Sequence, residues 1–417
     1  MIVSNVTSPK ATKKSKRLSR LALSTCSASL LMLAPVAHAQ IVITDGQSTP
    51  VENPGGQTVT ADEGVTQTVD SGDNVELENN TNDGSTIENS GTLINNDEDD
   101  EDVVVFIDNS EDDVVINNTA TGIMRGVDGV IFQEGDALTL TNAGLIEGTG
   151  AATEGVIYFD RDSDSNENSI TNSGTITGVG GPTIGVDTLL GSVGGDEDTA
   201  TAADPVTFTG TATLTIINSG TISNTDTGSN ADAINFNGDP GNTSEGSLGG
   251  SSDNPRGCLE NIAGSDTPQI NCQVNFTLTN SGTISTASTD TGSAAIRSES
   301  DAVINGSITN TADGVITGAS RGIFINGAHA DHDLDISNAG TISGTGEGGV
   351  GLLITGAGVD VNNSGTISGA DYGLSVASTT ITVREGDRTA ENNATVGASR
   401  DVEDVAVAAV NLSLIHI

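Results

Sequence analysis

The sequence predicts an all-β chain that folds as a right-handed parallel β-helix, a solenoid of about ten coils, preceded by a signal peptide. Two observations predict the solenoid: a five-residue motif recurs along the chain, and short runs of aliphatic residues lie between its copies. A third observation argues against a helical solenoid, because no stretch after the leader has a sustained apolar stripe of helical period.

The motif is clearest in residues 363–369, which read Asn-Ser-Gly-Thr-Ile-Ser-Gly. Because Asn and Gly tolerate positive φ and Thr-Ile favours extended backbone, each copy predicts a bend followed by a strand. Successive copies begin 24 to 30 residues apart, except for two intervals of 46 and 62 residues. We expect the first residue of each copy to occupy the same corner of its coil, where side chains can hydrogen-bond along the stack. These corner residues are Asn89, Asn118, Asn142, Asn172, Asn218, Asn280, Asn310, Asn338 and Asn363.

The aliphatic runs predict the other strands of each coil. One run follows the motif, as in residues 350–354, and another precedes the next motif, as in residues 359–361. One period therefore holds about three short strands, which pair with the coils above and below and point Ile or Val inward. The isoleucine of the motif should then form one interior column. Members of this column are Ile176, Ile222, Ile284, Ile342 and Ile367.

The first 39 residues have the pattern of a signal peptide. Six basic residues precede an apolar run from Leu21 to Val36, and Ala37-His38-Ala39 follows as a small-residue cleavage site. We therefore expect cleavage between Ala39 and Gln40 and export of the rest. The apolar run is too short to span a membrane, and no later segment has 18 apolar residues in a row.

Composition narrows the class of partner. The leader carries six of the 14 basic residues and no acidic residue, so the mature chain has 8 basic against 57 acidic residues, a formal net charge of −49. Such a surface repels nucleic acid and anionic membranes and favours solubility. An acidic chain with few aromatic residues can also be disordered. Disorder throughout is not expected here, because the aliphatic residues recur in phase with the motif.

The repeat divides the mature chain into segments. Residues 40–86 are expected to form an N-terminal cap and degenerate first coils, since a solenoid needs a capped end. Residues 87–383 should form the β-helix. Two insertions near residues 187–210 and 224–275, rich in Gly, Asp, Ser and Thr, should project from it as loops.

The end of the sequence departs from the repeat. Residues 384–411 are expected to be further solenoid or a linker. Residues 412–417 read Leu-Ser-Leu-Ile-His-Ile and resemble the translated end of a sequencing adaptor, so we expect the natural protein to continue differently past residue 411. A genuine short C-terminus is the alternative.

Two cysteines remain after removal of the leader. Cys258 and Cys272 lie 14 residues apart inside the longer insertion. In an exported protein we expect them to form a local disulfide, with two free thiols as the alternative. Without a nearby histidine they are a poor metal site.

Metal and cofactor signals are weak. Asp160, Asp162 and Asp164 resemble the first half of a calcium loop, but Gly at position six and Glu at position twelve are missing. A solvated acidic corner is the default interpretation there. His329 and His332 flank an aspartate, and for this segment too we expect a solvated corner and not a metal site. We predict no cofactor, with calcium as the one weak candidate.

Two patterns are similar to catalytic motifs. Residues 318–322 match G-x-S-x-G, but Gly318 occupies the position of Gly344 in another coil, so the repeat explains the match. Residues 224–226, Asn-Thr-Asp, are similar to one motif of the polygalacturonases, which are β-helices. The Asp-Asp, Gly-His-Gly and Arg-Ile-Lys elements of that family do not follow. With 2% aromatic residues, no sugar-stacking platform is evident. We therefore predict no catalytic residues and no enzyme.

The leader, the Asn-Ser-Gly-Thr-Ile repeats and the acidic Gly/Thr/Ser-rich composition together resemble the passenger of a bacterial autotransporter, over roughly residues 85–370. The resemblance implies type V secretion and a location at the outer-membrane surface of a Gram-negative bacterium or outside the cell. It implies the outer-membrane assembly machinery as a partner, and a structural or adhesive role toward an unknown host or cell-surface ligand. The alternatives are an exported β-helical enzyme that degrades polysaccharide, and a secreted repeat adhesin exported through a separate partner pore.

Overall fold

A computed structural model describes most of the chain after the leader. The described residues are 40–53, 56–77, 84–97, 102–108, 113–135, 137–152, 155–159, 167–187, 193–194, 207–208, 212–237, 273–299, 302–326, 331–376, 381–385 and 395–396. The expected signal peptide and its cleavage site before Gln40 therefore lie outside or at the edge of this part.

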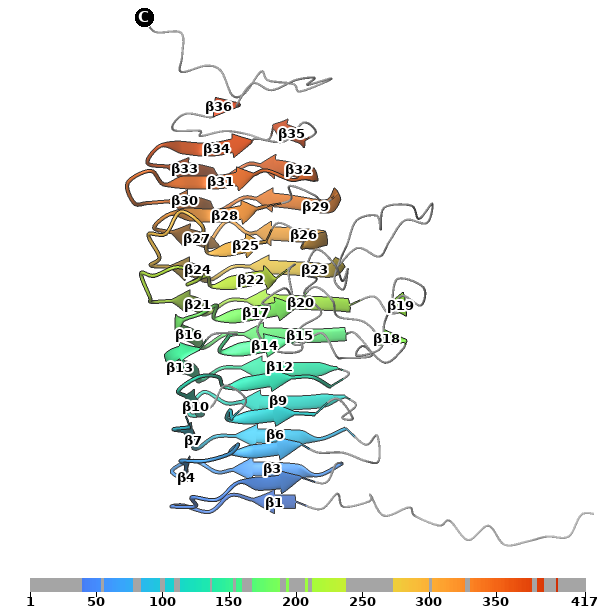
Figure 1. Cartoon of the computed structure of the whole chain (residues 1–417), viewed down its shortest axis with the longest axis vertical. Helices are drawn as coiled ribbons and strands as arrows, with labels where there is room; N and C mark the ends of the chain where they lie inside the picture. The colour runs from blue at the N-terminus through green and yellow to red at the C-terminus, as the bar shows by residue number, and fades with distance from the viewer. Residues whose placement is uncertain are drawn as a thin grey trace, which may run out of the picture. The chain divides into compact units, whose positions relative to one another are not determined.

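The described residues form a right-handed parallel β-helix, as the sequence predicts (Figure 1). Its strands belong to three sheets, called A, B and C here, and each turn of the chain passes through them in that order. Within these three sheets, every strand pairs in parallel with the equivalent strand of the neighbouring coils. No helix is present among the described residues, and thus none that could cross a membrane.

Sheet A has 12 strands, and each one from β6 to β32 ends on the asparagine of the motif. The asparagine ends the strand because the residues after it turn the chain toward sheet B. In stacking order the strands of sheet A are β1 (Gln40–Val42), β3 (Thr58–Ala61), β6 (Thr86–Asn89), β9 (Val114–Asn118), β12 (Leu138–Asn142), β15 (Glu167–Asn172), β20 (Ala212–Asn218), β23 (Gln273–Asn280), β26 (Val303–Asn310), β29 (Asp331–Asn338), β32 (Ala357–Asn363) and β35 (Ile381–Glu385).

Sheet B has 10 strands and contains the Thr-Ile part of the motif, whose β-branched residues favour extended backbone. Its strands are β4 (Thr66–Val69), β7 (Thr92–Asn95), β10 (Ile123–Gly126), β13 (Leu145–Ala152), β16 (Thr175–Gly180), β21 (Thr221–Asn224), β24 (Thr283–Thr286), β27 (Val315–Gly318), β30 (Thr341–Gly344) and β33 (Thr366–Gly369).

Sheet C has 12 short strands, most of them built from the aliphatic run that follows the motif in each period. Its strands are β2 (Val51–Asn53), β5 (Val75–Leu77), β8 (Val105–Ile107), β11 (Ile131–Gln133), β14 (Ile157–Phe159), β17 (Ile184–Asp187), β22 (Ile234–Asn237), β25 (Ile296–Ser298), β28 (Arg321–Ile325), β31 (Val350–Ile354), β34 (Tyr372–Val376) and β36 (Thr395–Val396).

We number the coils from the N-terminus, so that coil 1 contains β1 and β2 and coil 2 contains β3, β4 and β5. Coils 2 to 11 have a strand in all three sheets, which gives ten complete coils, the predicted number. Coil 1 has no sheet B strand among the described residues; a single bridge from Gln47 to Gln67 takes its place.

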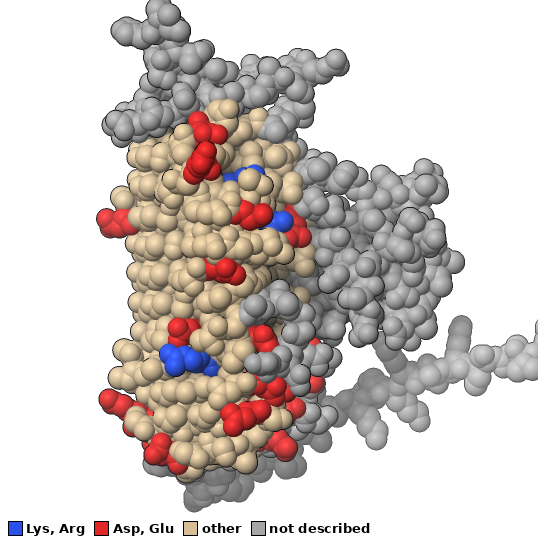
Figure 2. Space-filling view, turned by 60° about the vertical axis from the view of Figure 1, so that its left-hand side comes forward, with Lys and Arg blue, Asp and Glu red and all other residues tan. Residues whose placement is uncertain are grey.

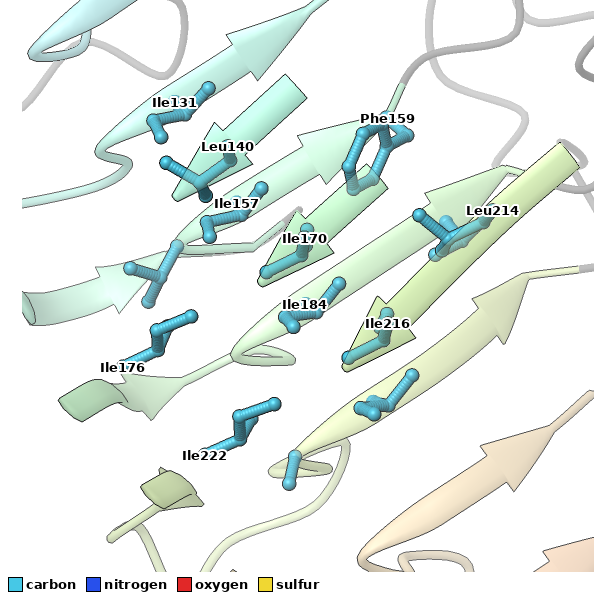
Figure 3. Close-up of a cluster of buried hydrophobic side chains, with 14 of the residues drawn as sticks. Ile131, Leu140, Ile157, Phe159, Ile170, Ile176, Ile184, Leu214, Ile216 and Ile222 are labelled. Carbon is cyan, nitrogen blue, oxygen red and sulfur yellow. The ribbon is translucent and has the colours of Figure 1, made fainter. Parts of the chain in front are cut away.

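The interior is a set of largely aliphatic columns that face inward from all three sheets (Figure 3). In sheet B, the register pairs Ile176 with Ile222, Ile222 with Ile284, and Ile342 with Ile367. The predicted column is therefore present, with Ile316 between Ile284 and Ile342. All of these side chains are fully buried except Ile367, which is partly buried near the end of the stack.

Both long insertions connect a sheet C strand to the next sheet A strand. One lies between β17 and β20, and its described part is an antiparallel pair, β18 (Val193–Gly194) and β19 (Thr207–Phe208). The other lies between β22 and β23. Because β22 pairs with β17, residues 234–237 belong to coil 7, and this insertion begins after Asn237, later than the repeat spacing suggested.

The solenoid continues past residue 383, in the segment for which the sequence left further solenoid or a linker open. Strand β35 pairs with β32 and ends at Glu385, and β36 pairs with β34 at residues 395–396. Part of the segment that we expected to be further solenoid or a linker is thus solenoid. Residues 412–417 lie outside the described part.

Candidate functional site

The most regular polar feature is a ladder of nine asparagines at the corner between sheets A and B. It consists of the nine predicted corner residues. The Nδ2 atom of each asparagine donates a hydrogen bond to Oδ1 of the asparagine in the next coil, over 2.7–2.8 Å in all eight steps. The ladder crosses the intervals of 46 and 62 residues without a break, so neither insertion disturbs the stacking of this corner.

Each amide of the ladder also satisfies backbone groups of the turn. Asn218, which is fully buried, donates to the backbone oxygens of Gly220 at 3.3 Å and Thr283 at 3.2 Å. The glycine is required for close approach: a Cβ on Gly282 would lie 2.1 Å from the backbone oxygen of Gly220 in the preceding coil. A neutral amide that is hydrogen-bonded on all sides supplies no acid, base or nucleophile, so this corner is structural.

The corner between sheets B and C is built differently. Where the connection is short, the sheet B strand ends on glycine, as at Gly318, Gly344 and Gly369. Where the connection is long, the strand ends on a buried polar residue that orders the loop. Asn224 donates from Nδ2 to the backbone oxygens of Gly181 at 2.6 Å and Asp232 at 3.2 Å.

This geometry bears on the polygalacturonase-like motif at residues 224–226. Asn224 is 2% exposed, and its Oδ1 accepts the backbone N–H of Asp226 at 3.0 Å. The carboxylate of Asp226 in turn accepts the N–H groups of Thr227 and Gly228. All three interactions shape a turn, so the motif lies in a structural loop.

Two buried aspartates lie at the same position of this corner in different coils. Asp73 and Asp232 each precede a sheet C strand by two residues and are 9% and 0% exposed. Asp73 Oδ1 accepts the backbone N–H of Val103 at 2.7 Å, and Asp232 Oδ1 accepts that of Ala294 at 2.6 Å. Both donors belong to the next coil, so each aspartate ties two coils together.

The surroundings of the two carboxyl groups differ. Burial raises the pKa of Asp73 to about 7, and the carboxylates of Asp102, Glu76 and Asp97 act in the same direction, against the hydrogen bond that it accepts. Burial also raises the pKa of Asp232, to about 6. The guanidinium of Arg297 acts against this rise by stabilising the ionised carboxylate.

Arg297 of β25 forms ion pairs with two carboxylates. Its Nη1 lies 3.3 Å from Asp232 Oδ2, and its Nη2 lies 3.2 Å from Glu299 Oε1. In the next coil, Arg321 lies over the ring of Phe324 at 4.5 Å, a cation–π contact. Burial and the charge of Arg297 both lower the pKa of Arg321.

Arginine and lysine are sparse on the face shown in Figure 2.

Three aromatic residues form a row on sheet C that sequence reasoning missed. The register pairs Phe106 with Phe132 and Phe132 with Tyr158. Their ring centroids are 5.7 and 5.2 Å apart, and Phe132 is 7% exposed. Because the rings pack on one another along the stack, they do not present a flat row of ring faces for sugar stacking.

The expected solvated corner at His329 and His332 is wrong for His332. This side chain is 4% exposed in β29, and its Nδ1 accepts the backbone N–H of Ile304 at 3.1 Å. It alternates inward with Leu334 and Ile336, as period-2 patterning requires. His329 lies outside the described residues, which contain no group of three His, Cys, Asp or Glu side chains that could hold a metal ion.

The G-x-S-x-G match lies at a corner of coil 9. Ser320 is 8% exposed, and its backbone N–H donates to the backbone oxygen of Ser288 at 3.1 Å. Gly318 pairs with Gly344 of the next coil, so the two glycines occupy the same position of the repeat, as the sequence indicated. The strand–turn–strand setting is not that of a nucleophile elbow, in which a helix follows the turn.

Several predicted residues lie outside the described part of the chain. They are the calcium candidates Asp160, Asp162 and Asp164 and the expected disulfide pair Cys258 and Cys272. These assignments remain predictions.

No family model, no curated protein and no solved structure matches this chain. The fold and the side-chain geometry therefore carry the functional argument.

Proposed function

We propose that this chain is the passenger of an autotransporter-like bacterial protein, exported to the cell surface or beyond, with a structural or adhesive role and no catalytic activity. The observation that carries the proposal is the unbroken asparagine ladder, which keeps one corner of the solenoid constant while long insertions leave from another. Such a scaffold can hold variable loops at fixed positions, which is how rigid folds commonly display binding surfaces.

The position of the insertions supports this role. Both leave at the corner between sheets C and A, from coils 6 and 7, which are neighbours in the stack. Their joint position would let them form one binding surface. Since each coil contacts only its neighbours, the solenoid can also fold coil by coil as it leaves a pore.

The buried corner residues favour a non-catalytic role over a polysaccharide-degrading enzyme. Ser320 and Asn224 belong to the two patterns that are similar to catalytic motifs. Both are buried, and the Asn224 side chain donates hydrogen bonds to backbone oxygens of the corner. A secreted repeat adhesin that is exported through a separate partner pore is the other non-catalytic alternative, because it would use the same scaffold.

The proposal is tested by displaying the full-length gene product on Gram-negative cells and measuring adhesion to host-cell monolayers and abiotic surfaces. We expect protease added outside intact cells to remove the chain. Replacing residues 238–272 with a short Gly-Ser link should reduce adhesion about tenfold while the far-UV circular dichroism of the solenoid is kept. The matched control replaces the same residues with a scrambled sequence of equal length. Retention of the chain in the cytoplasm, or adhesion unaffected by replacement of residues 238–272, would reject the proposal.

A further inference from the structure

Asp73 and Asp232 join neighbouring coils in the same way but in different electrostatic surroundings. Both carboxylates accept the backbone N–H of the equivalent residue in the next coil, which is Val103 for Asp73 and Ala294 for Asp232. A buried N–H that loses its acceptor is costly, so each carboxyl group helps hold its two coils together.

Asp232 has a cation beside it, whereas the described residues place none beside Asp73. Arg297 Nη1 is 3.3 Å from Asp232 Oδ2, and Glu299, which also faces Asp232, is itself 3.2 Å from Arg297 Nη2. The Arg297 guanidinium therefore lies between two carboxylates and offsets one of their two negative charges.

Around Asp73, the charged groups of the described residues that act on its carboxyl are all acidic: Asp102, Glu76 and Asp97. Asp97 and Asp102 are held at this corner because both accept the backbone N–H of Gly72, at 3.1 and 3.2 Å. Ionisation of Asp73 thus adds a negative charge to a buried corner that already holds three carboxyl groups.

We propose that Asp73 is a pH-dependent latch between coils 2 and 3, closed when its carboxyl group is protonated and weakened when the carboxylate forms. The neutral carboxyl keeps an oxygen that accepts the Val103 N–H, so protonation removes the repulsion without breaking the contact between coils. The N-terminal coils should therefore loosen first when the medium turns alkaline.

The direction and range follow from linkage. The pKa of Asp73 is about 7 in the fold against 3.8 for the ordinary carboxyl group, so its stabilising effect is complete below pH 4 and is lost as the pH rises through 7. Between pH 5.5 and 8.0, these values lower the equilibrium constant for closed over open coils 2 and 3 by about thirtyfold. For Asp232, with a pKa of about 6, the same interval gives a loss of about fourfold.

The test is hydrogen–deuterium exchange of the purified chain at pH 5.5 and 8.0, corrected for the intrinsic exchange rates. In the wild type, the amides of residues 102–108 should lose about thirtyfold in protection between the two pH values. In Asp73→Asn they should lose less than threefold, since the side-chain amide oxygen still accepts the Val103 N–H. The control Asp70→Asn, on an exposed aspartate of the same corner, should behave as the wild type.

The proposal fails if wild-type protection changes less than twofold, or if Asp73→Asn keeps the full loss. Should Asp73→Asn not fold, Asp97→Asn removes one neighbouring charge and must show a smaller loss than the wild type; an equal loss also counts against the latch. None of these outcomes depends on whether the chain is exported or adhesive.

Discussion

At the corner between sheets A and B, the same amide recurs in nine coils and is buried in eight of them, whereas at the corner between sheets B and C the buried polar groups change from coil to coil. The first corner is closed by asparagines that bond to copies of themselves. The second is closed by Asn95, Asp73, Asn224, Asp232 or Thr286, depending on the coil. Its connections range from two residues between β27 and β28 to nine between β24 and β25.

The difference follows from the chemistry of the side chains. An amide is both donor and acceptor, so an asparagine can satisfy an identical neighbour above and below without any charge. A carboxylate only accepts, and a second carboxylate in the next coil would repel it. A ladder can therefore extend through the stack, whereas each buried aspartate needs an individual arrangement of backbone N–H groups or an arginine.

Replacing one rung of the ladder by its acidic isostere should have the largest effect on stability. Asn218→Asp puts an unpaired charge at a fully buried position and removes the donor that bonds to Asn280 Oδ1 at 2.8 Å. We expect a loss of about 3–5 kcal/mol at pH 8, as for other uncompensated buried charges. The introduced carboxyl will have a raised pKa, so the loss should shrink as the pH falls and the group is protonated.

The measurement is the urea midpoint by far-UV circular dichroism, which suits a chain without tryptophan. Asn362→Asp is the matched control, since Asn362 is exposed in the last strand that carries the ladder. If the two variants unfold at the same urea concentration, the asparagine corner does not have the role that we give it.

Removing the cation at the other corner should have the second-largest effect. Arg297→Leu leaves Asp232 ionised and fully buried without its partner at pH 8, and we expect a loss of about 2–4 kcal/mol there. At pH 5 the loss should be smaller: the pKa of Asp232 is raised, so the native carboxyl is then mostly protonated and depends less on the arginine.

The matched control is Arg125→Leu, which breaks the Arg125–Glu147 ion pair of 2.7 Å on the outside of sheet B. Arg125 is 40% exposed, and such pairs contribute about 0–1 kcal/mol. Hydrogen exchange of residues 231–237 localises the effect. A pH-independent loss in Arg297→Leu would show that the arginine acts through packing alone.

The repeated corner is also why the fold could be predicted from the sequence. Each rung of the ladder and each isoleucine of the sheet B column has the same neighbours as the next, so constant spacing reveals them. The aspartates could not be found in this way. Asp73 and Asp232 lie in unlike sequences, and their backbone partners are 30 and 62 residues away.

Two local errors have similar physical causes. Residues 234–237 were assigned to an insertion because the interval between motifs is stretched there, yet Ile234 and Phe236 are buried and pair with coil 6. His332 was expected in solvent because its segment was assigned to a corner of the coil. The alternation of Asp333 and Asp335 outward with Leu334 and Ile336 inward placed it on the inner side and could have been recognised.

The smallest expected effect concerns the last rung of the ladder. Asn363 is only partly buried; it accepts one hydrogen bond from Asn338 at 2.7 Å and donates to the backbone oxygen of Gly365 at 3.2 Å. Because solvent can replace part of this bonding, Asn363→Ala should cost about 0.5–1 kcal/mol. Asn218→Ala, in the buried middle of the ladder, should cost about 2–3 kcal/mol, because donors and acceptors in two neighbouring coils lose partners. Urea midpoints of the two variants, measured together, decide the point: equal losses would mean that the ladder acts locally at each turn and not through contact between rungs.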